Sequence, residues 1–179
     1  FLLSESESMT TQVSPAPKAR KNIQPELVQF EPEFLAGLHE IFEKRVAFNQ
    51  TIGLKIGAIS PTLVHGHIAM RPELIGHEAY ERIHGGVISA GLDSMGGLAV
   101  MAAIAARHMD DTPMQRLQRF SRLGTIDLRV DYLRPGIGKE FLLTAKVIRL
   151  GSRVANTQME FLSADGELLS TGTAAYIVS

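Results

Sequence analysis

The chain contains 179 residues, of which 45% are hydrophobic and 21% charged, and it has no cysteine. These proportions are typical of one globular domain that buries a core without disulfides, and the lack of thiols excludes cysteine nucleophiles and thiolate metal sites. With 18 basic against 19 acidic residues, the chain lacks the positive charge of a nucleic-acid-binding protein. A small-molecule ligand is the better expectation.

Residues 1–30 are expected to lie outside the folded domain, which we place at residues 31–179. Residues 1–8 precede Met9, which reads as a natural start, and are interpreted as an artificial extension. The following stretch is polar and interrupted by prolines, as in a disordered tail. The chain begins with neither the basic leader nor the apolar run of a signal peptide, so we expect a cytoplasmic protein.

The stretch from Gly85 to Ala106 carries only one charge, that of Asp93. Its length would suffice to cross a bilayer. Five glycines dilute its hydrophobicity, however, and a carboxylate within the span costs about 2.5–3.5 kcal/mol on insertion scales. A helix that is apolar all round is also what the centre of a soluble domain contains, so we expect a buried core helix and no membrane span.

The remaining elements before residue 124 follow from periodicity and turn residues. Residues 33–48 place apolar side chains at helical spacing, which predicts a short amphipathic helix. Ser60-Pro61 divides two strand-like stretches. In chain order we therefore expect a helix at 33–48, strands at 52–59 and 63–70, an irregular stretch at 71–83, a long helix at 84–108, and a loop or short exposed helix at 110–122.

The last third of the chain changes to the period of a strand. Ile126, Leu128, Val130 and Tyr132 alternate with polar residues, which predicts a strand with one buried face. Turn signals then separate the further stretches, and in all we expect strands at 124–133, 140–150, 153–162 and 168–178. Four consecutive strands with short turns indicate an antiparallel meander, so the fold class is α+β and a doubly wound parallel sheet is disfavoured.

Two motifs give the sequence a resemblance to a known family. The first is Ile83-His84-Gly85-Gly86-Val87-Ile88-Ser89-Ala90-Gly91-Leu92-Asp93 at the start of the long helix, and the second is Gly124-Thr125-Ile126-Asp127-Leu128-Arg129-Val130-Asp131-Tyr132-Leu133-Arg134-Pro135-Gly136. Together they resemble the hotdog-fold acyl-CoA thioesterases, and more narrowly the phenylacetate-pathway (PaaI-like) type and its YigI-like bacterial subgroup. The resemblance covers about residues 33–179.

The resemblance implies a curved antiparallel sheet wrapped around a long central helix, with a short N-terminal helix. It also implies dimers, and often tetramers built as dimers of dimers. The activity implied is hydrolysis of acyl-CoA thioesters to the free acid and coenzyme A. No metal or redox cofactor is expected, since coenzyme A is part of the substrate.

The start of the long helix has the properties of an oxyanion hole. The first amides of a helix have no internal acceptor and lie at the positive end of its dipole. Gly85 and Gly86 lack β-carbons, so a substrate carbonyl could approach those amides closely. Asp93, the one acidic residue of this helix, could then act as the base that activates water or as a nucleophile. The alternative for Asp93 is a buried structural carboxylate.

The spacing of these residues suggests that two protomers build each site. Seven residues separate Gly86 from Asp93, which places them on nearly the same helix face but about 10 Å apart. Both groups cannot reach one reacting carbon. We therefore expect an antiparallel copy of the helix beside the first, with each of two sites in a dimer taking its glycines from one chain and Asp93 from the other.

Further candidates are less specific. The family often has a hydroxyl at the position of Thr125, which could orient the water or the carboxylate or could simply be a sheet hydroxyl. His84 could shape the carbonyl site or only cap the helix. Many relatives carry an asparagine about six residues before the histidine, where Glu78 stands, and Gly76-His77 could substitute for it. The arginines that could meet the phosphates of coenzyme A, or merely be solvated, are Arg134, Arg149 and Arg153.

Other functions remain open at this stage. His65 and His67 share one face of a strand, but no third ligand lies nearby in sequence, so we expect no metal site. The same fold could also serve as a hydratase or dehydratase acting on acyl thioesters, or as a non-catalytic acyl-CoA-binding module. The segment 109–123 could cover the substrate pocket or merely connect elements.

Overall fold

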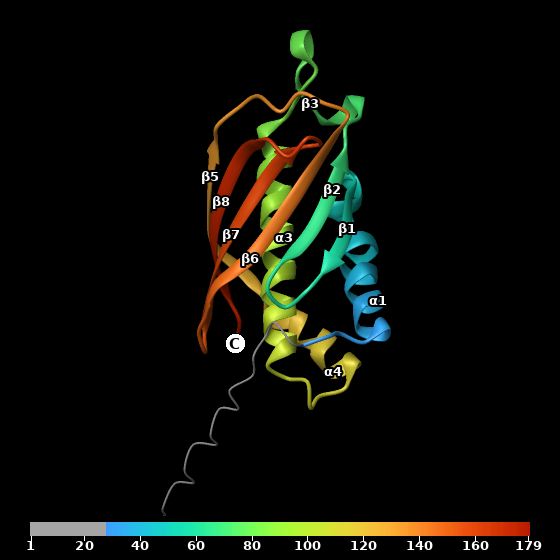
Figure 1. The fold of residues 1–179 in the computed structure, drawn as a ribbon, viewed down its shortest axis with the longest axis vertical. Helices are drawn as coiled ribbons and strands as arrows, with labels where there is room; N and C mark the ends of the chain where they lie inside the picture. The colour runs from blue at the N-terminus through green and yellow to red at the C-terminus, as the bar shows by residue number, and fades with distance from the viewer. Residues whose placement is uncertain (1–27) are drawn as a thin grey trace, which may run out of the picture.

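The computed structural model describes residues 28–179 (Figure 1). The expected artificial extension and the polar tail lie outside the described residues. The described chain forms a curved antiparallel sheet around a long helix, with a short N-terminal helix beside it, which is the hotdog arrangement implied by the two motifs.

Six strands form the main sheet, in the order β1-β2-β6-β7-β8-β5, and each neighbouring pair is antiparallel. A separate two-stranded ribbon of β3 and β4 precedes the long helix. The strands are β1 (Leu54–Ile59), β2 (Val64–Ala69), β3 (Ile75–His77), β4 (Arg82–Ile83), β5 (Gly124–Tyr132), β6 (Glu140–Leu150), β7 (Val154–Ser163) and β8 (Leu168–Ile177).

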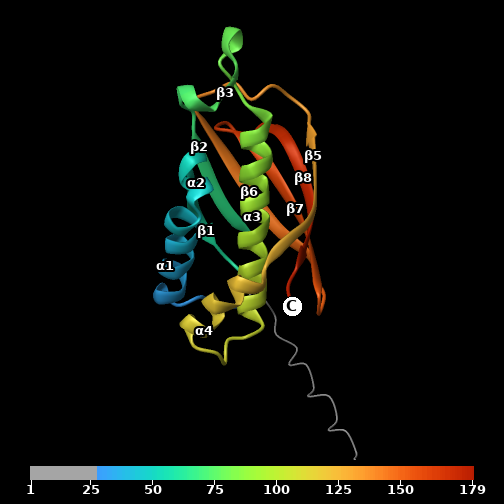
Figure 2. The same ribbon diagram turned by 180° about the vertical axis from the view of Figure 1, so that it is seen from behind.

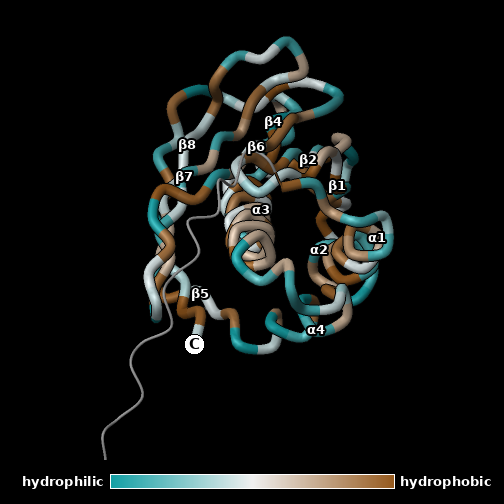
Figure 3. The backbone as a smooth tube through the Cα atoms, turned by 60° about the horizontal axis from the view of Figure 1, so that its bottom comes forward, coloured by the Kyte–Doolittle hydropathy of each residue, from teal (hydrophilic) through white to brown (hydrophobic). Residues whose placement is uncertain are grey.

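The long helix α3 (Gly85–Ala106) lies in the hollow of this sheet (Figures 1 and 2). When the lower end of the molecule in Figure 1 is tilted towards the viewer, the strands are seen to curve round α3, and the helices α1, α2 and α4 lie beside it on the open side (Figure 3). α3 is long and apolar enough to cross a membrane, but 61% of its most apolar stretch is buried inside the fold. It therefore has the position expected of a core helix.

The prediction of a single helix over residues 33–48 is wrong. The chain forms α1 (Pro32–Glu40), a π-helical turn η2 (Ile41–Arg45) and α2 (Ala47–Ile52). Val46 interrupts the helix, because its backbone is extended, and the buried Asn49 side chain donates to Phe42 O at 2.9 Å. The helical period continues across the break because both pieces bury apolar residues in the same core.

The segment after α3 is more than an exposed connection. It forms α4 (Pro113–Gln118), which begins with a capping box between Thr112 and Gln115, and a 3₁₀ turn η5 (Arg119–Arg122). Arg116 of α4 is fully buried, with its guanidinium 2.6 Å from Glu31 Oε2 and 4.7 Å from the centre of the Phe34 ring. This segment is thereby attached to the N-terminal helix.

The expected four-stranded meander is correct only for β6, β7 and β8. β5 does not pair with β6; it pairs with β8 and forms an edge of the sheet. The link of residues 133–139 crosses over the start of α3 instead of making a tight turn (Figure 1). The predicted buried face of β5 is also only partly buried: the pairing register shifts between Thr125 and Asp127 and leaves Ile126 without a partner, and Ile126 remains 57% exposed and Tyr132 54%.

Candidate active site

His84 caps the start of α3, and its ring accepts a hydrogen bond at Nδ1 from the Gly86 amide at 2.8 Å. Because Nδ1 is an acceptor here, the neutral imidazole carries its proton on Nε2. The Gly85 amide has no hydrogen-bond acceptor within the described residues. The Gly85 amide is thus the free donor at the positive end of the helix dipole.

A cavity of about 390 Å³ surrounds this helix start. Tyr132 of β5 lines it and donates its hydroxyl to Gly85 O at 2.9 Å, which fixes the strand against the first turn of α3. Arg82 and Arg134 also line the cavity. A pocket with one free backbone donor and guanidinium groups is suited to an anionic or strongly polarised ligand.

Asp93 lies two turns further along α3 and accepts hydrogen bonds from two side-chain hydroxyls. Thr125 Oγ1 donates to Asp93 Oδ1 at 2.8 Å. The buried Tyr176 hydroxyl lies 2.8 Å from the main-chain O of Asp93 and 3.2 Å from its Oδ1. Both contacts to the carboxylate therefore involve Oδ1, and within the described residues Oδ2 accepts no hydrogen bond.

Tyr176 is confined to the role of a hydrogen-bond donor at this site. Burial, and then the neighbouring Asp93 carboxylate, raise the pKa of Tyr176 far above its usual range. Its hydroxyl reaches α3 because residue 96 is a glycine, since a β-carbon at Gly96 would collide with that hydroxyl. Tyr176 and Thr125 together hold Asp93 in one orientation.

The two halves of the site lie apart within one chain. Gly85 and Asp93 are eight residues apart on one helix, about 12 Å along its axis. β5 connects them at its two ends, because Tyr132 contacts Gly85 and Thr125 contacts Asp93. The structure thus brings His84, Gly85 and Gly86 together and pairs Asp93 with Thr125, but it leaves these two groups separate within one protomer.

The remaining predicted residues are more scattered. The ring of His77 lies 5.1 Å from that of Tyr80, and the preceding Gly76 packs closely against His84. Arg134 Nε lies 2.9 Å from Glu167 Oε1 near the start of α3. Arg149 and Arg153 lie at the other end of β6, around the β6–β7 turn.

Sequence reasoning missed three residues of the site. Tyr132 stands in a quoted motif but without a role, and Arg82 lies just before the glycines. Tyr176 is a polar residue on the buried face of β8, and a hydroxyl at a core position is the one local signal that could have indicated it. Its partner Asp93 lies 83 residues away in sequence.

The histidines of β2 form no metal site. Within residues 28–179 there is no group of three or more His, Cys, Asp or Glu side chains that could hold a metal ion. His67 Nε2 instead lies 3.8 Å from Glu140 Oε1 on the neighbouring strand β6.

Known proteins match most of the length of this chain. The model of the family described as Thioesterase superfamily matches residues 80–170. The medium/long-chain acyl-CoA thioesterase YigI of Salmonella typhimurium is 36% identical over 139 residues, or 78% of this chain and 90% of the relative. The protein of the same name from Escherichia coli K12 is 34% identical over 139 residues, with the same coverage.

The fold also matches solved structures. The crystal structure of a Shewanella oneidensis protein related to the thioesterase superfamily has a TM-score of 0.77 and 40% sequence identity, covering 84% of this chain and all of that one. The resemblance inferred from the two motifs is confirmed by these matches. The chain is an enzyme that belongs to the thioesterase superfamily.

Proposed function

We propose that this enzyme hydrolyses acyl-CoA thioesters to the free acid and coenzyme A. The observation that carries the proposal is the oriented carboxylate of Asp93, held by Thr125 and Tyr176, on the same helix whose start offers the free Gly85 amide. The relatives named as medium/long-chain acyl-CoA thioesterases support the substrate class. Medium and long acyl chains are accordingly the substrates we propose.

The proposed chemistry needs a hydrogen-bond donor for the thioester carbonyl oxygen and a base that activates water. The thioester carbonyl oxygen accepts from the Gly85 amide, and the His84 ring, fixed by Gly86, offers its Nε2–H beside it. Asp93 Oδ2 takes a proton from water as the water oxygen attacks the carbonyl carbon. The tetrahedral intermediate then expels the coenzyme A sulfur, which receives that proton. Attack by Oδ2 itself would instead expel the coenzyme A thiolate and form a mixed anhydride with the acyl group. Water attack at the Asp93 carbonyl of this anhydride would then place labelled oxygen from H₂¹⁸O into the Asp93 carboxylate.

We further propose that the reacting groups meet between two protomers. β5 is an edge strand with exposed apolar side chains, which favours pairing with a second copy. An antiparallel pair of β5 strands centred between Leu128 and Arg129 would set Thr125 opposite the partner subunit's Tyr132. Since Thr125 contacts Asp93 and Tyr132 contacts Gly85, this register would bring Asp93 towards the partner subunit's Gly85.

The same pairing would place the arginines around one substrate. Arg134 lies beside the start of α3, whereas Arg153 lies near the start of β5, because β5 and β7 both pair with the end of β8. Arg134 of one protomer and Arg153 of the other would then flank one thioester. We propose that they, with Arg82, bind the phosphates of coenzyme A.

Asp93→Asn is the experiment that tests the activity. Asparagine keeps an oxygen for the Thr125 and Tyr176 hydroxyls but cannot take a proton from water, so we expect release of free thiol to fall by about 10³-fold. Acyl-CoA binding, measured by calorimetry, should persist. The control is Asp165→Asn, in the exposed β7–β8 turn.

Three results would contradict the proposal. Unchanged turnover in Asp93→Asn would exclude Asp93 as the base or nucleophile. Binding of acyl-CoA by the wild-type protein without thiol release would indicate a non-catalytic binding module. Addition of water to crotonyl-CoA without cleavage of the thioester would indicate a hydratase.

A further inference from the structure

One glycine of α3, Gly97, is not required by close packing among the described residues. Glycine inside a helix costs about 0.5–1 kcal/mol relative to alanine. Gly96 is required by the approach of Tyr176, but a β-carbon at the buried Gly97 would lie 3.5 Å from Leu123 Cδ2 and 4.0 Å from Phe42 Cε1. These are ordinary contact distances, so alanine would fit at residue 97 in the described chain.

The position of Gly97 connects it to the reaction. It follows Asp93 by four residues and therefore lies on the same helix face, about 6 Å further along. Leu123, which faces Gly97, stands two residues before Thr125, which holds Asp93. Residue 97 thus leaves room for one β-carbon between α3 and Leu123, about one helical turn beyond Asp93.

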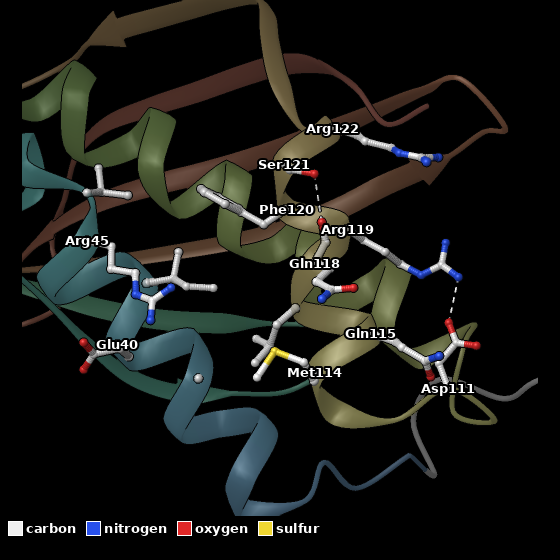
Figure 4. Close-up of a pocket in the computed structure, with 14 residues that line it drawn as sticks. Glu40, Arg45, Asp111, Met114, Gln115, Gln118, Arg119, Phe120, Ser121 and Arg122 are labelled. Atoms are coloured by element: carbon white, nitrogen blue, oxygen red, sulfur yellow. Dashed lines mark hydrogen bonds and ion pairs between the residues drawn. The ribbon is translucent and has the colours of Figure 1, made fainter.

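A second cavity lies beyond Leu123 and Phe42. The Phe42 ring is 5.4 Å from the Phe120 ring, and Phe120 lines a cavity of about 1000 Å³ between the N-terminal helices and the segment 111–122. Figure 4 shows Phe120 and Met114 on the side of that segment and Arg45 and Glu40 on the side of the N-terminal helices. Its volume is at the upper end for small-molecule pockets.

The lining of this cavity suits an alkyl chain with an open outer end. Its apolar side chains are Ile41, Val46, Met114, Leu117 and Phe120. The exposed Arg45 and Arg122 also line it, and Arg119 is paired with Asp111 at 2.7 Å. Burial of one methylene contributes about 0.8 kcal/mol, which corresponds to about fourfold in kcat/KM.

We propose that the acyl chain of the substrate runs from Asp93 along α3 past Gly97, and that its distal methylenes occupy the cavity between η2 and α4. This inference rests on the proposed acyl-CoA thioesterase activity and assigns the subsite that reads chain length. Gly97 sets the space available to the first carbons of the acyl chain, whereas Val46 and Phe120 set the space available to its last carbons. The segment 109–123 is then the cover of the acyl chain.

The test is a chain-length profile of kcat/KM from butyryl-CoA to hexadecanoyl-CoA, measured by release of free thiol. Gly97→Ala should reduce the ratio of dodecanoyl to butyryl turnover by at least about tenfold while its melting temperature stays equal or rises, because alanine favours the helix. The matched control is Gly57→Ala on β1, where a β-carbon would also lie 3.5 Å from its nearest neighbour, His65 Cβ. It should keep the wild-type ratio.

A second variant probes the far end of the path. Val46→Phe extends a half-buried side chain of the cavity and should reduce the ratio of hexadecanoyl to octanoyl turnover by about tenfold or more, with a smaller effect on dodecanoyl-CoA. Its control is Ile148→Phe, an exposed position of β6 that does not line the cavity. We therefore expect Gly97→Ala to discriminate against shorter acyl chains than Val46→Phe does.

The outcomes separate this inference from the activity on which it rests. If Gly97→Ala and Val46→Phe fold and hydrolyse all chain lengths in the wild-type ratios, or lose all of them equally, the acyl path is wrong and the thioesterase activity stands. If the wild-type protein releases no thiol from any acyl-CoA, the proposed function itself fails, and the acyl subsite fails with it.

Discussion

The Tyr176 hydroxyl lies 2.8 Å from the main-chain oxygen of Asp93 and 3.2 Å from its Oδ1. One tyrosine on β8 therefore touches both the backbone and the side chain of the residue to which we assign the base. Thr125 occupies the same Oδ1 at 2.8 Å. The second oxygen, Oδ2, accepts no hydrogen bond within the described residues and is the one that we propose activates the water.

We predict that Tyr176→Phe lowers kcat about tenfold and leaves KM unchanged, because the carboxylate loses one of its two orienting donors while the substrate contacts remain. If Tyr176 served only the stability of the fold, the variant would melt at a lower temperature and contain less folded protein, but kcat per folded molecule would equal that of the wild type. Tyr80→Phe, at an exposed tyrosine that contacts His77, should match the wild type. Because burial raises the pKa of Tyr176, wild-type kcat should show no loss from ionisation of Tyr176 up to pH 10.

We predict that Gly85→Pro lowers kcat by about 10²–10³-fold, because it removes the one amide proposed to bind the oxyanion. Proline is favoured at the first position of a helix, and His84 before it already has the extended backbone, φ −67° and ψ 135°, that a following proline requires. The helix should therefore persist, as circular dichroism would verify. Gly85→Ala keeps the amide but adds a β-carbon 3.3 Å from Tyr132 Cε1, so it should lose less activity than Gly85→Pro, and equal losses in both variants would contradict the assignment.

We predict that two inactive variants restore activity when mixed. In a heterodimer of Asp93→Asn and Gly85→Pro, one site would combine the intact amide of the first with the intact carboxylate of the second. After exchange of subunits at equal amounts, half of the dimers would be mixed and half of their sites complete, so about a quarter of wild-type activity should return. No recovery after verified exchange would show that each protomer supplies both groups itself.

We predict that Glu31→Gln lowers the free energy of unfolding by about 1–2 kcal/mol at pH 7, because the buried Arg116 loses its carboxylate partner. The effect is smaller than for a fully buried ion pair, because Glu31 is 44% exposed. The hydrogen bond from Arg116 lowers the pKa of Glu31 below its ordinary value of 4.5. A lowered pKa in the folded state stabilises the protein above pH 4.5, and this stabilisation is lost as the pH falls through the folded value.

The measurement is the difference in melting temperature between the wild type and Glu31→Gln as a function of pH. The difference should be largest near neutrality, should decrease as the pH falls below 4.5, and should vanish once the pH lies below the lowered pKa of Glu31, where the carboxyl is protonated in both states. Glu33→Gln, at an exposed position of α1, is the control. A difference that stays constant down to pH 3 would show that the ion pair is not its source.

The sequence predicts those parts of the fold that depend on local patterns. The helix α3 and the strands β6, β7 and β8 lie within a few residues of their expected ranges, because period and turn residues are local signals. The placement of β5 beside β8 is a non-local pairing, which no turn between β5 and β6 specifies. The break at Val46 was missed because the apolar spacing continues through it.

The candidate site likewise contains residues that local sequence patterns predict and residues that depend on contacts between distant parts of the chain. His84, Gly85 and Asp93 are separated by a few residues on one helix, so their relative positions follow from helix geometry. Tyr176 could not be placed, because its contact with Asp93 depends on the packing of β8 against α3. The buried position of Arg116 likewise depends on Glu31 and Phe34, which lie far from it in sequence.

The attachment of β5 to α3 at Thr125 and Tyr132 restricts where the sequence can tolerate insertions and deletions. Insertions or deletions in the link of residues 133–139 or in the β7–β8 turn would leave both hydroxyl contacts where they are. A change in the number of residues between the two contacts could not be absorbed, because the helix fixes the separation of Asp93 and Gly85. Homologues that retain the activity should therefore vary in loop length but keep this seven-residue interval.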